Sequence, residues 1–215
     1  MAVASSKRVL APVEASDQAL RKRGARRAHI VRVAKHLFAT HGFQATSLRD
    51  IGDAAGVLPG SLYHHFKTKD EILNEIIKDF MVDILQSYTE VVAVGGDSRS
   101  TLRALIRSGI KEIAENQEAH IILFYEYKYL SRNKIFQYID DIVAEIFQIW
   151  FGVMQEGVRS GQFRRPSNLN LTVRVLLNAL NGMVTSWLRT HGQYRLEDLI
   201  EAQLEVLFHG IETPA

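Results

Sequence analysis

The chain has no cysteine among its 215 residues. Without cysteine it can form neither a disulfide nor a thiolate site, which excludes disulfide frameworks and cysteine nucleophiles and fits a reducing compartment. No apolar run approaches the roughly 18 residues that a membrane span needs, and residues 1–20 lack the unbroken apolar stretch of a signal peptide. We therefore expect a soluble, cytoplasmic protein with no membrane association.

Motifs of the common enzyme chemistries are also missing. The chain contains no G-x-S-x-G, P-loop, G-x-G-x-x-G or H-E-x-x-H pattern. Asp140, Asp141 and Glu145 form a carboxylate cluster that fits the solvated face of an amphipathic helix. His64 and His65 are adjacent, so on a helix they point about 100° apart and cannot chelate one ion. The sequence therefore predicts no enzyme, no cofactor and no metal site.

Charge is distributed unevenly along the chain, although the formal net charge is only +2. Residues 1–69 carry 12 Lys and Arg against 4 Asp and Glu, whereas residues 70–215 carry 14 against 20. A basic N-terminal part can neutralise phosphate while an acidic body stays away from the duplex, which favours DNA binding. Simple solvation of a basic segment is the alternative interpretation.

Helical periodicity is the pattern that recurs along the chain. Gly42 predicts a left-handed end to the first clear helix, with Phe43 folding back on its last turn. The apolar residues of that helix recur at the spacing of one helix face: Ile30, Val33, Ala34, Leu37 and Phe38. Strand-like alternation and internal repeats are lacking, so the sequence predicts an all-α fold of about nine helices. The later helices are expected at about residues 100–116, 118–131, 134–160, 168–190 and 196–210.

Two short helices joined by a glycine turn are expected between Ser47 and Phe66, with the dimensions of a DNA-reading helix-turn-helix. Gly56 supplies the turn, and Pro59 suits the first turn of the second helix because its missing N–H would be unbonded there. The exposed face of that helix offers small or planar hydrogen-bonding groups, namely Gly60, Ser61, Tyr63 and His64. Arg49 and Lys69 lie at the starts of the flanking helices, where backbone N–H groups favour phosphate.

Three nearby segments, TSLRDI at 46–51, AAGV at 54–57 and GSLYHHFKTKDEIL at 60–73, closely resemble the tetracycline-repressor (TetR/AcrR) family. The resemblance is ungapped and covers roughly residues 30–80. It implies a homodimeric transcriptional repressor whose third helix enters the major groove of an inverted-repeat operator. It also implies a C-terminal domain that binds a small-molecule effector and releases the DNA.

The matched positions imply a set of DNA contacts, made chiefly to backbone phosphates. The predicted DNA-binding residues are Ser47, Arg49, Pro59, Gly60, Ser61, Tyr63, His64, His65 and Lys69. One position departs from the family pattern, because Leu58 stands where the family often has a serine that caps the third helix.

Three regions follow from this interpretation. We expect a flexible basic extension at residues 1–22, a helix-turn-helix domain at 23–69 with its motif at about 48–67, and a ligand-binding and dimerisation domain at 70–215. The arginines of the extension fit either plain solvation or an arm that touches the minor groove, and the sequence leaves both open.

The ligand-binding residues are harder to identify, because aromatic and methionine side chains line apolar pockets and fill cores equally well. The aromatic and methionine candidates are Phe124, Tyr125, Tyr129, Phe147, Trp150 and Met154. The recognition-helix run at 60–66 looks most like family members that govern lipid or steroid breakdown, which implies an apolar effector such as an acyl-CoA or fatty acid.

A polar stripe crosses the otherwise apolar helix expected at 168–190. Its members are Arg174, Asn178, Asn181 and Thr185. They fit a narrow solvent-facing stripe. They equally fit polar groups inside the pocket, with Arg174 placed to bind a carboxylate or phosphate.

The last two expected helices are apolar on broad faces and predict a symmetric four-helix dimer interface. One apolar line runs through Leu180 and Val184, where an introduced charge is expected to dissociate or unfold the protein. Two other functions remain open. The same scaffold could serve an activator or dual regulator, or the helix-turn-helix could be structural in a small-molecule-binding protein or enzyme.

Overall fold

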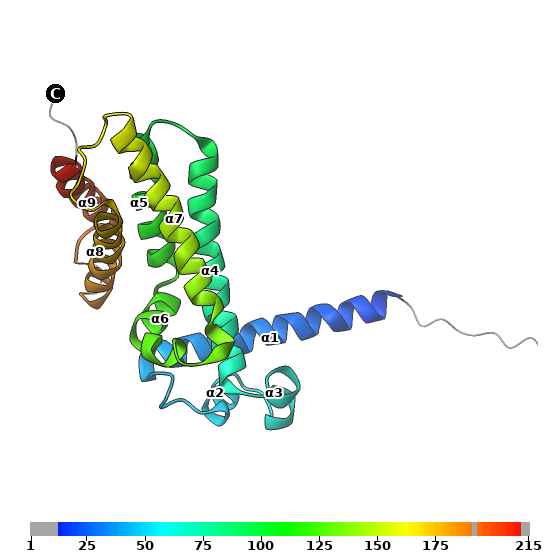
Figure 1. Cartoon of the computed structure of the whole chain (residues 1–215). Coiled ribbons are helices and arrows are strands. Elements are labelled where there is room, and N and C mark those ends of the chain that lie inside the picture. The colour runs from blue at the N-terminus through cyan, green and yellow to red at the C-terminus, as the bar shows by residue number, and fades with distance from the viewer. Residues whose placement is uncertain (1–12, 191–192, 212–215) are drawn as a thin grey trace, which may run out of the picture.

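The computed structural model describes residues 13–190 and 193–211, and over these residues the chain forms helices and no strand (Figure 1). This confirms the predicted all-α fold. None of the helices in the described ranges is long and apolar enough to span a membrane. The helices are α1 (Val13–His41), α2 (Leu48–Ala54), α3 (Pro59–His65), α4 (Lys69–Val94), α5 (Ser98–Glu115), α6 (Gln117–Leu130), α7 (Tyr138–Arg159), α8 (Leu169–Arg189) and α9 (Leu196–Ile211), with a short 3-10 turn, η1 (Lys134–Phe136), before α7.

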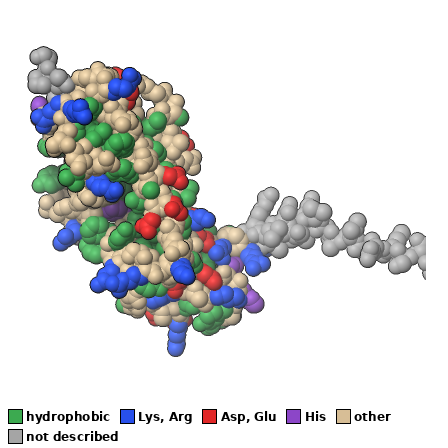
Figure 2. Space-filling view, in the orientation of Figure 1, with side chains coloured by type: hydrophobic (Ala, Val, Ile, Leu, Met, Phe, Trp, Pro, Cys, Tyr) green, Lys and Arg blue, Asp and Glu red, His purple; other side chains and the backbone are tan. Residues whose placement is uncertain are grey.

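The helices form a small head and a larger body. The head consists of α1, α2 and α3 at the lower end of Figure 1, and the N-terminal part of α1 projects away from it. In the body, α4, α5 and α7 pack against one another, and α6 lies between this bundle and α1. In Figure 2, Lys and Arg side chains lie around the head and also at the upper end of the body, and several Asp and Glu side chains lie along the visible face of the body.

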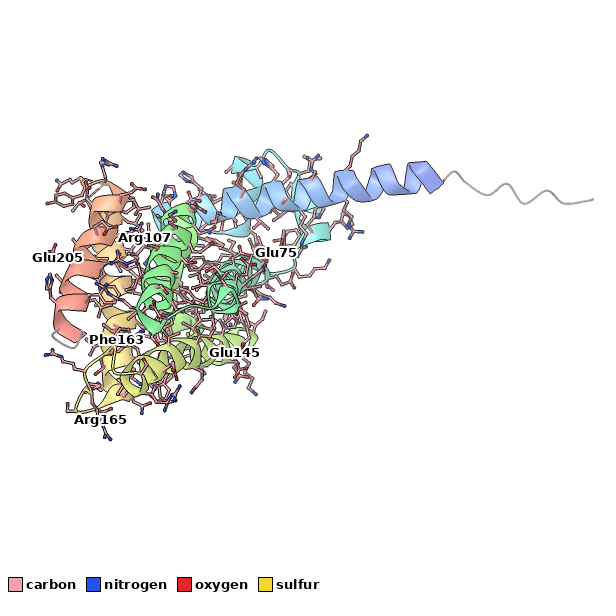
Figure 3. All side chains as sticks on the ribbon, turned by 90° about the horizontal axis from the view of Figure 1, so that it is seen from above. Glu75, Arg107, Glu145, Phe163, Arg165 and Glu205 are labelled. Carbon is pink, nitrogen blue, oxygen red and sulfur yellow. The ribbon has the colours of Figure 1, made fainter. Side chains whose placement is uncertain are left out.

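An outer layer of α8 and α9 completes the body on the side away from the projecting end of α1 (Figure 3). The apolar inner face of α8 packs on α5 and α7, and α9 packs on α5. Arg107 lies on the side of α5 that faces α9, and both it and Arg103 pair with Glu201 of α9.

The helix ends in the head match the local signals in the sequence. Gly42 ends α1 with φ of 86°, and the Phe43 ring packs edge-on against Phe38 at 5.0 Å, which confirms the predicted end of this helix. The hydroxyl of Ser47 accepts the Asp50 N–H while the Asp50 carboxylate accepts the Ser47 N–H, so the capping box at the start of α2 is complete.

Two boundaries differ from the predictions. Helix α1 begins at Val13, so residues 13–22 are helical where a flexible extension was expected; residues 1–12 of that extension lie outside the described residues. Good helix formers without Gly or Pro occupy positions 13–23, which explains the continuation. Helix α7 begins at Tyr138 rather than near 134, because the Asn133 side chain accepts the Ile135 N–H and closes a separate 3-10 turn.

The outer layer corrects one expectation about assembly. Leu180 and Val184 are buried inside the subunit, between α8 and the rest of the body, and do not belong to an exposed face. The exposed apolar residues of this layer lie elsewhere, at Leu171 and Val175 on α8 and Val206 on α9. A charge at Leu180 or Val184 therefore tests the core of the subunit rather than an interface.

Candidate DNA interface and effector cavity

The second helix of the helix-turn-helix presents an open face. Tyr63 is 49% exposed, and Pro59, Gly60 and His64 are exposed, whereas Ser61 is half-buried. Leu62 on the opposite side of α3 is buried against the head. The buried side fixes α3 in place, and the open side is free to enter a groove of DNA.

The residues at the start of α2 are also accessible. Arg49 is exposed, and its guanidinium lies 3.7 Å from the Asp53 carboxylate, which is a weak surface contact that a phosphate can replace. Ser47 is exposed as well, but its hydroxyl already serves the capping box. Hydrogen bonds from Ser47 lower the pKa of Asp50, so the carboxylate of this cap is held ionised.

Two predicted DNA contacts are partly engaged within the head. The Lys69 ammonium donates to the backbone oxygen of Phe43 at 2.6 Å and lies 4.3 Å from the centre of the Phe43 ring, and burial lowers its pKa. His65 is half-buried; burial first, and then the charges of Arg23 and Arg27, lower its pKa. Lys69 thus stabilises the turn between α1 and α2, and DNA contact by either residue remains a prediction.

Arg27 holds the head together, a role that the sequence interpretation missed. Its guanidinium donates to the Glu75 carboxylate of α4 at 2.5 and 2.9 Å and to the backbone oxygen of His65 at 2.7 Å. It also lies 4.0 Å from the centre of the Phe66 ring. One side chain therefore joins α1, the end of α3 and α4. The sequence does not reveal this role, because Arg27 is one of five cations within residues 21–27 and nothing in that run distinguishes it from the others.

A cavity of about 650 Å³ lies in the body, between α4, α5, α6, α7 and α8. Its volume is typical of small-molecule sites. The inner wall is apolar and comes mainly from α4, with Phe80, Met81 and Ile84. The mouth lies between α6, α7 and α8, where the lining residues Phe124, Tyr127 and Val143 are about half exposed.

The polar stripe of α8 lies at this mouth. Arg174, Asn178 and Asn181 line the cavity and are also exposed to solvent. They therefore match both alternatives that the sequence left open, a solvent-facing stripe and a set of polar groups in the pocket. The Arg174 guanidinium lies 4.7 Å from the centre of the Phe147 ring, another lining residue. Thr185, the fourth member of the stripe, is buried and hydrogen-bonds to His120.

The cavity brings together five of the nine predicted ligand-binding residues and leaves out four. Phe124, Phe147, Arg174, Asn178 and Asn181 line it. Trp150 and Met154 are buried in the core, where Trp150 packs edge-on against Tyr88. Tyr125 is 60% exposed outside the cavity, and Tyr129 donates to the Asp70 carboxylate. The residues of α7 that line the cavity are Val143, Ile146 and Phe147, whereas Trp150 and Met154, one and two turns further along the same face, belong to the core.

Other lining residues were not predicted, notably Tyr88, His120 and Tyr127. His120 and Tyr127 belong to the aromatic run that begins α6, but nothing local distinguishes lining residues from core residues there. Tyr88 lies far along α4 in an ordinary amphipathic pattern. They can be assigned to the cavity only from the tertiary structure, in which five helices surround it.

Helix α6 joins the cavity to the head. While His120, Leu123 and Phe124 line the cavity, other residues of α6 contact the head and the start of α4. The contacts are Glu118 with His36 at 2.8 Å, Glu126 accepting the Phe43 N–H at 3.3 Å and Tyr129 with Asp70 at 2.5 Å. A displacement of α6 by a ligand would therefore act directly on the head.

This combination defines a class of protein: a ligand-responsive transcriptional repressor, with a DNA-reading helix-turn-helix on a hollow helical domain. Comparison with known proteins identifies the family. Residues 30–76 match the profile of bacterial regulatory proteins of the tetR family, and residues 95–211 match the tetracyclin repressor-like C-terminal domain. The chain belongs to the tetR family, whose members are transcriptional regulators.

Individual relatives cover most of the chain. It is 36% identical to the HTH-type transcriptional repressor KstR2 of Rhodococcus jostii, over 88% of this chain and 92% of the relative. The solved structure of the ketosteroid transcriptional regulator KstR2 of Mycobacterium tuberculosis superposes with a TM-score of 0.82 at 28% identity, covering 88% of this chain and 96% of that one. FadR from Bacillus subtilis, solved in complex with stearoyl-CoA, shares the fold with a TM-score of 0.70 at 24% identity, covering 86% and 99%.

Proposed function

We propose that this protein is a homodimeric repressor that binds an inverted-repeat operator and leaves it when an anionic ligand with a large apolar body enters the cavity. The observation that carries the ligand proposal is the position of Arg174, a cation at the mouth of a largely apolar cavity. A guanidinium binds carboxylate or phosphate oxygens through charge-assisted hydrogen bonds. Fatty acids and acyl-CoA thioesters combine this anionic chemistry with an apolar chain.

The open face of α3 supports the DNA part of the proposal. We assign the DNA contacts to Ser47, Arg49, Pro59, Gly60, Ser61, Tyr63, His64, His65 and Lys69, with Arg49 and Lys69 at phosphates. Tyr63→Ala should weaken operator binding without changing thermal stability, because the side chain is half exposed. Lys69→Ala should lower both, because its ammonium also holds the Phe43 carbonyl.

The exposed apolar faces of α8 and α9 support a dimer. Leu171 and Val175 lie one turn apart on α8 and are each 57% exposed, and Val206 on α9 is 74% exposed. A four-helix interface between two copies would cover them and should bury more than about 1,000 Å². Two recognition helices would then read successive major grooves roughly 34–36 Å apart, which requires an inverted repeat.

Release would follow from a shift of α6 and α4. Both helices line the cavity and both contact the head, through Glu126 and Phe43 on one side and through Arg27 and Glu75 on the other. A ligand moves such an equilibrium only as far as its affinities for the two states differ. The effector must therefore prefer a cavity shape that holds the two heads at a spacing unsuited to DNA.

The test follows DNA release from an operator selected by the wild-type protein from random duplexes. Fluorescence anisotropy is recorded while stearoyl-CoA, stearate or the neutral octadecanol is added. We expect release by the two anions. Arg174→Ala should raise the required anion concentration about tenfold or more, since a hydrogen bond to a charged group contributes about 1.5–3 kcal/mol.

The matched control is Arg189→Ala, because Arg189 is an exposed arginine at the end of the same helix and does not line the cavity. It should respond like the wild type. The ligand proposal is wrong if Arg174→Ala leaves the response to both anions unchanged. The DNA proposal is wrong if the wild type enriches no sequence from the pool.

A further inference from the structure

One histidine lies in the wall of the cavity with no charged partner. The His120 ring is edge-on to Phe80 at 6.3 Å and tilted against Phe124 at 6.4 Å, and all three residues line the cavity. The side chain is 4% exposed, and burial lowers its pKa to about 4, so it is neutral at pH 7.

The hydrogen bonds around His120 determine which ring nitrogen carries the proton. Nε2 of His120 lies 2.8 Å from the Thr185 hydroxyl oxygen, and that hydroxyl donates to the backbone oxygen of Asn181 at 2.7 Å. A hydroxyl has a single proton, so the Thr185 oxygen must accept from His120, and Nε2 must carry the hydrogen. In the neutral ring Nδ1 is then a bare acceptor.

Within the described residues this acceptor makes no hydrogen bond, and it does not belong to the fully enclosed polar atoms that lack a partner, so solvent in the cavity can reach it. A ligand that fills the cavity displaces water from Nδ1, and it leaves this acceptor unsatisfied unless the ligand itself supplies a hydrogen-bond donor. A ketone, ester or carboxylate oxygen offers only lone pairs and would repel Nδ1. A hydroxyl offers the proton that the site lacks.

Tyr88 adds a second polar atom to the α4 side of the cavity. Its hydroxyl also lacks a hydrogen-bond partner among the described residues, although the side chain is only 3% exposed. Gly109 of α5 makes room for it, because a Cβ there would lie 2.2 Å from the Tyr88 oxygen. Tyr88 can donate as well as accept, so it does not discriminate against ketones as His120 does.

We propose that the cavity selects effectors that carry a hydroxyl group on their apolar body, with Nδ1 of His120 accepting the hydroxyl proton. The proposal rests on the proposed function, because it takes this cavity as the effector site. The ligand then has two recognised ends: an anionic group at Arg174 and a hydroxyl among the aromatic residues around His120. A saturated acyl chain satisfies only the first.

The test uses three steroid acids that differ at one position. Cholanic acid has a carboxylate and an unsubstituted ring system, lithocholic acid adds one hydroxyl far from the carboxylate, and dehydrolithocholic acid has a ketone there. Their dissociation constants are measured by calorimetry on the purified full-length protein. The wild type should bind lithocholic acid about tenfold more tightly than the other two, as expected for one buried hydrogen bond.

Variants show which side chain binds the hydroxyl of the ligand. His120→Phe should bind all three acids alike. Thr185→Val keeps the side-chain shape but removes the acceptor that holds the proton on Nε2, so it should reduce the preference for the hydroxyl even if His120→Phe fails to fold. Tyr125→Phe, at an exposed tyrosine outside the cavity, serves as the control and should keep the preference. Tyr88→Phe tests the alternative that Tyr88 recognises the hydroxyl.

Three results would overturn the proposal: equal wild-type affinities for the three acids, a preference that survives both His120→Phe and Thr185→Val, or a preference lost only in Tyr88→Phe. Binding of none of the acids, while stearoyl-CoA still releases the operator, also overturns it and leaves the proposed function standing. The proposed function itself fails if stearoyl-CoA and stearate do not release DNA.

Discussion

The head and the body of this subunit use their polar side chains in opposite ways. In the head, Ser47, Arg27 and Lys69 all bind backbone atoms near helix ends, so polar groups hold the short helices in one arrangement. In the body, Arg174 and the Nδ1 atom of His120 face the cavity without such a partner. Rigid presentation suits a surface that reads DNA, whereas unpaired groups in a hollow suit a site that a ligand completes.

The head and the body are also stabilised in different ways. The head is small, and its order depends on caps and on the Arg27 cluster as well as on a few buried side chains such as Phe66. The body has a large apolar core that tolerates an internal cavity. Four predictions test this difference between head and body.

The largest effect is expected from a charge in the core of the body. Val184 is 0% exposed and does not line the cavity, so Val184→Asp should destabilise the subunit by roughly 3–5 kcal/mol, because the carboxylate would be buried without a partner. Thermal unfolding followed by circular dichroism measures the loss. The matched variant Val206→Asp, at a residue 74% exposed, should leave the fold intact and dissociate the dimer in sedimentation. A folded, dimeric Val206→Asp protein would contradict the proposed interface.

The next effect concerns pH and His120. Burial lowers its pKa from the ordinary 6.5 to about 4, so the unfolded chain binds this proton first as the pH falls. The contribution to stability is complete above pH 6.5 and decreases as the pH falls toward 4, by roughly 3 kcal/mol in total. The wild type should therefore lose more stability than His120→Gln between pH 7 and 4.5 in urea unfolding. Parallel curves for the two proteins would show that burial does not shift this histidine.

A smaller effect is expected at the junction of head and body. Arg27→Ala removes hydrogen bonds to Glu75 and to the His65 carbonyl, and should destabilise the head by about 1–2 kcal/mol because the side chain is partly solvated. Operator affinity should fall further than in Arg26→Ala, a neighbouring exposed arginine of the same charge. Hydrogen exchange of α3 amides measures the loosening. Equal exchange in the two variants would argue that Arg27 acts only through its charge.

The smallest effect is a gain. Leu58 occupies the N-cap position before helix α3; it is 79% exposed and makes no side-chain cap hydrogen bond. Leu58→Ser should accept a backbone N–H of the first turn and stabilise the protein by about 1 kcal/mol, visible as a higher melting temperature. Leu58→Ala supplies the control, since it shortens the side chain without adding a cap. If the serine and alanine variants melt together, the helix start does not limit stability.

Much of the head could be predicted from the sequence because its signals are local. Gly42 ends α1 as the sequence predicts, and Ser47 and Thr68 cap the starts of α2 and α4 through contacts with residues three positions further along the chain. The function of Arg27 could not be predicted in this way. Its partners Glu75 and His65 are 48 and 38 residues away, and nothing in the basic run singles it out.

In the body, the sequence predicts amphipathic helices, but it does not show which part of each apolar face borders the cavity. Phe147 and Trp150 look alike in the pattern of α7, yet one lines the cavity and the other fills the core. Likewise Leu180 and Val206 are both apolar residues of the last two helices, and only their packing separates the core from an exposed face. Hydrophobic periodicity shows how much of a helix surface avoids water, and it depends only on residues that are close along the chain. Whether an apolar face meets the core, the cavity or a partner depends on helices that are distant in sequence, and it therefore follows from how the whole subunit packs.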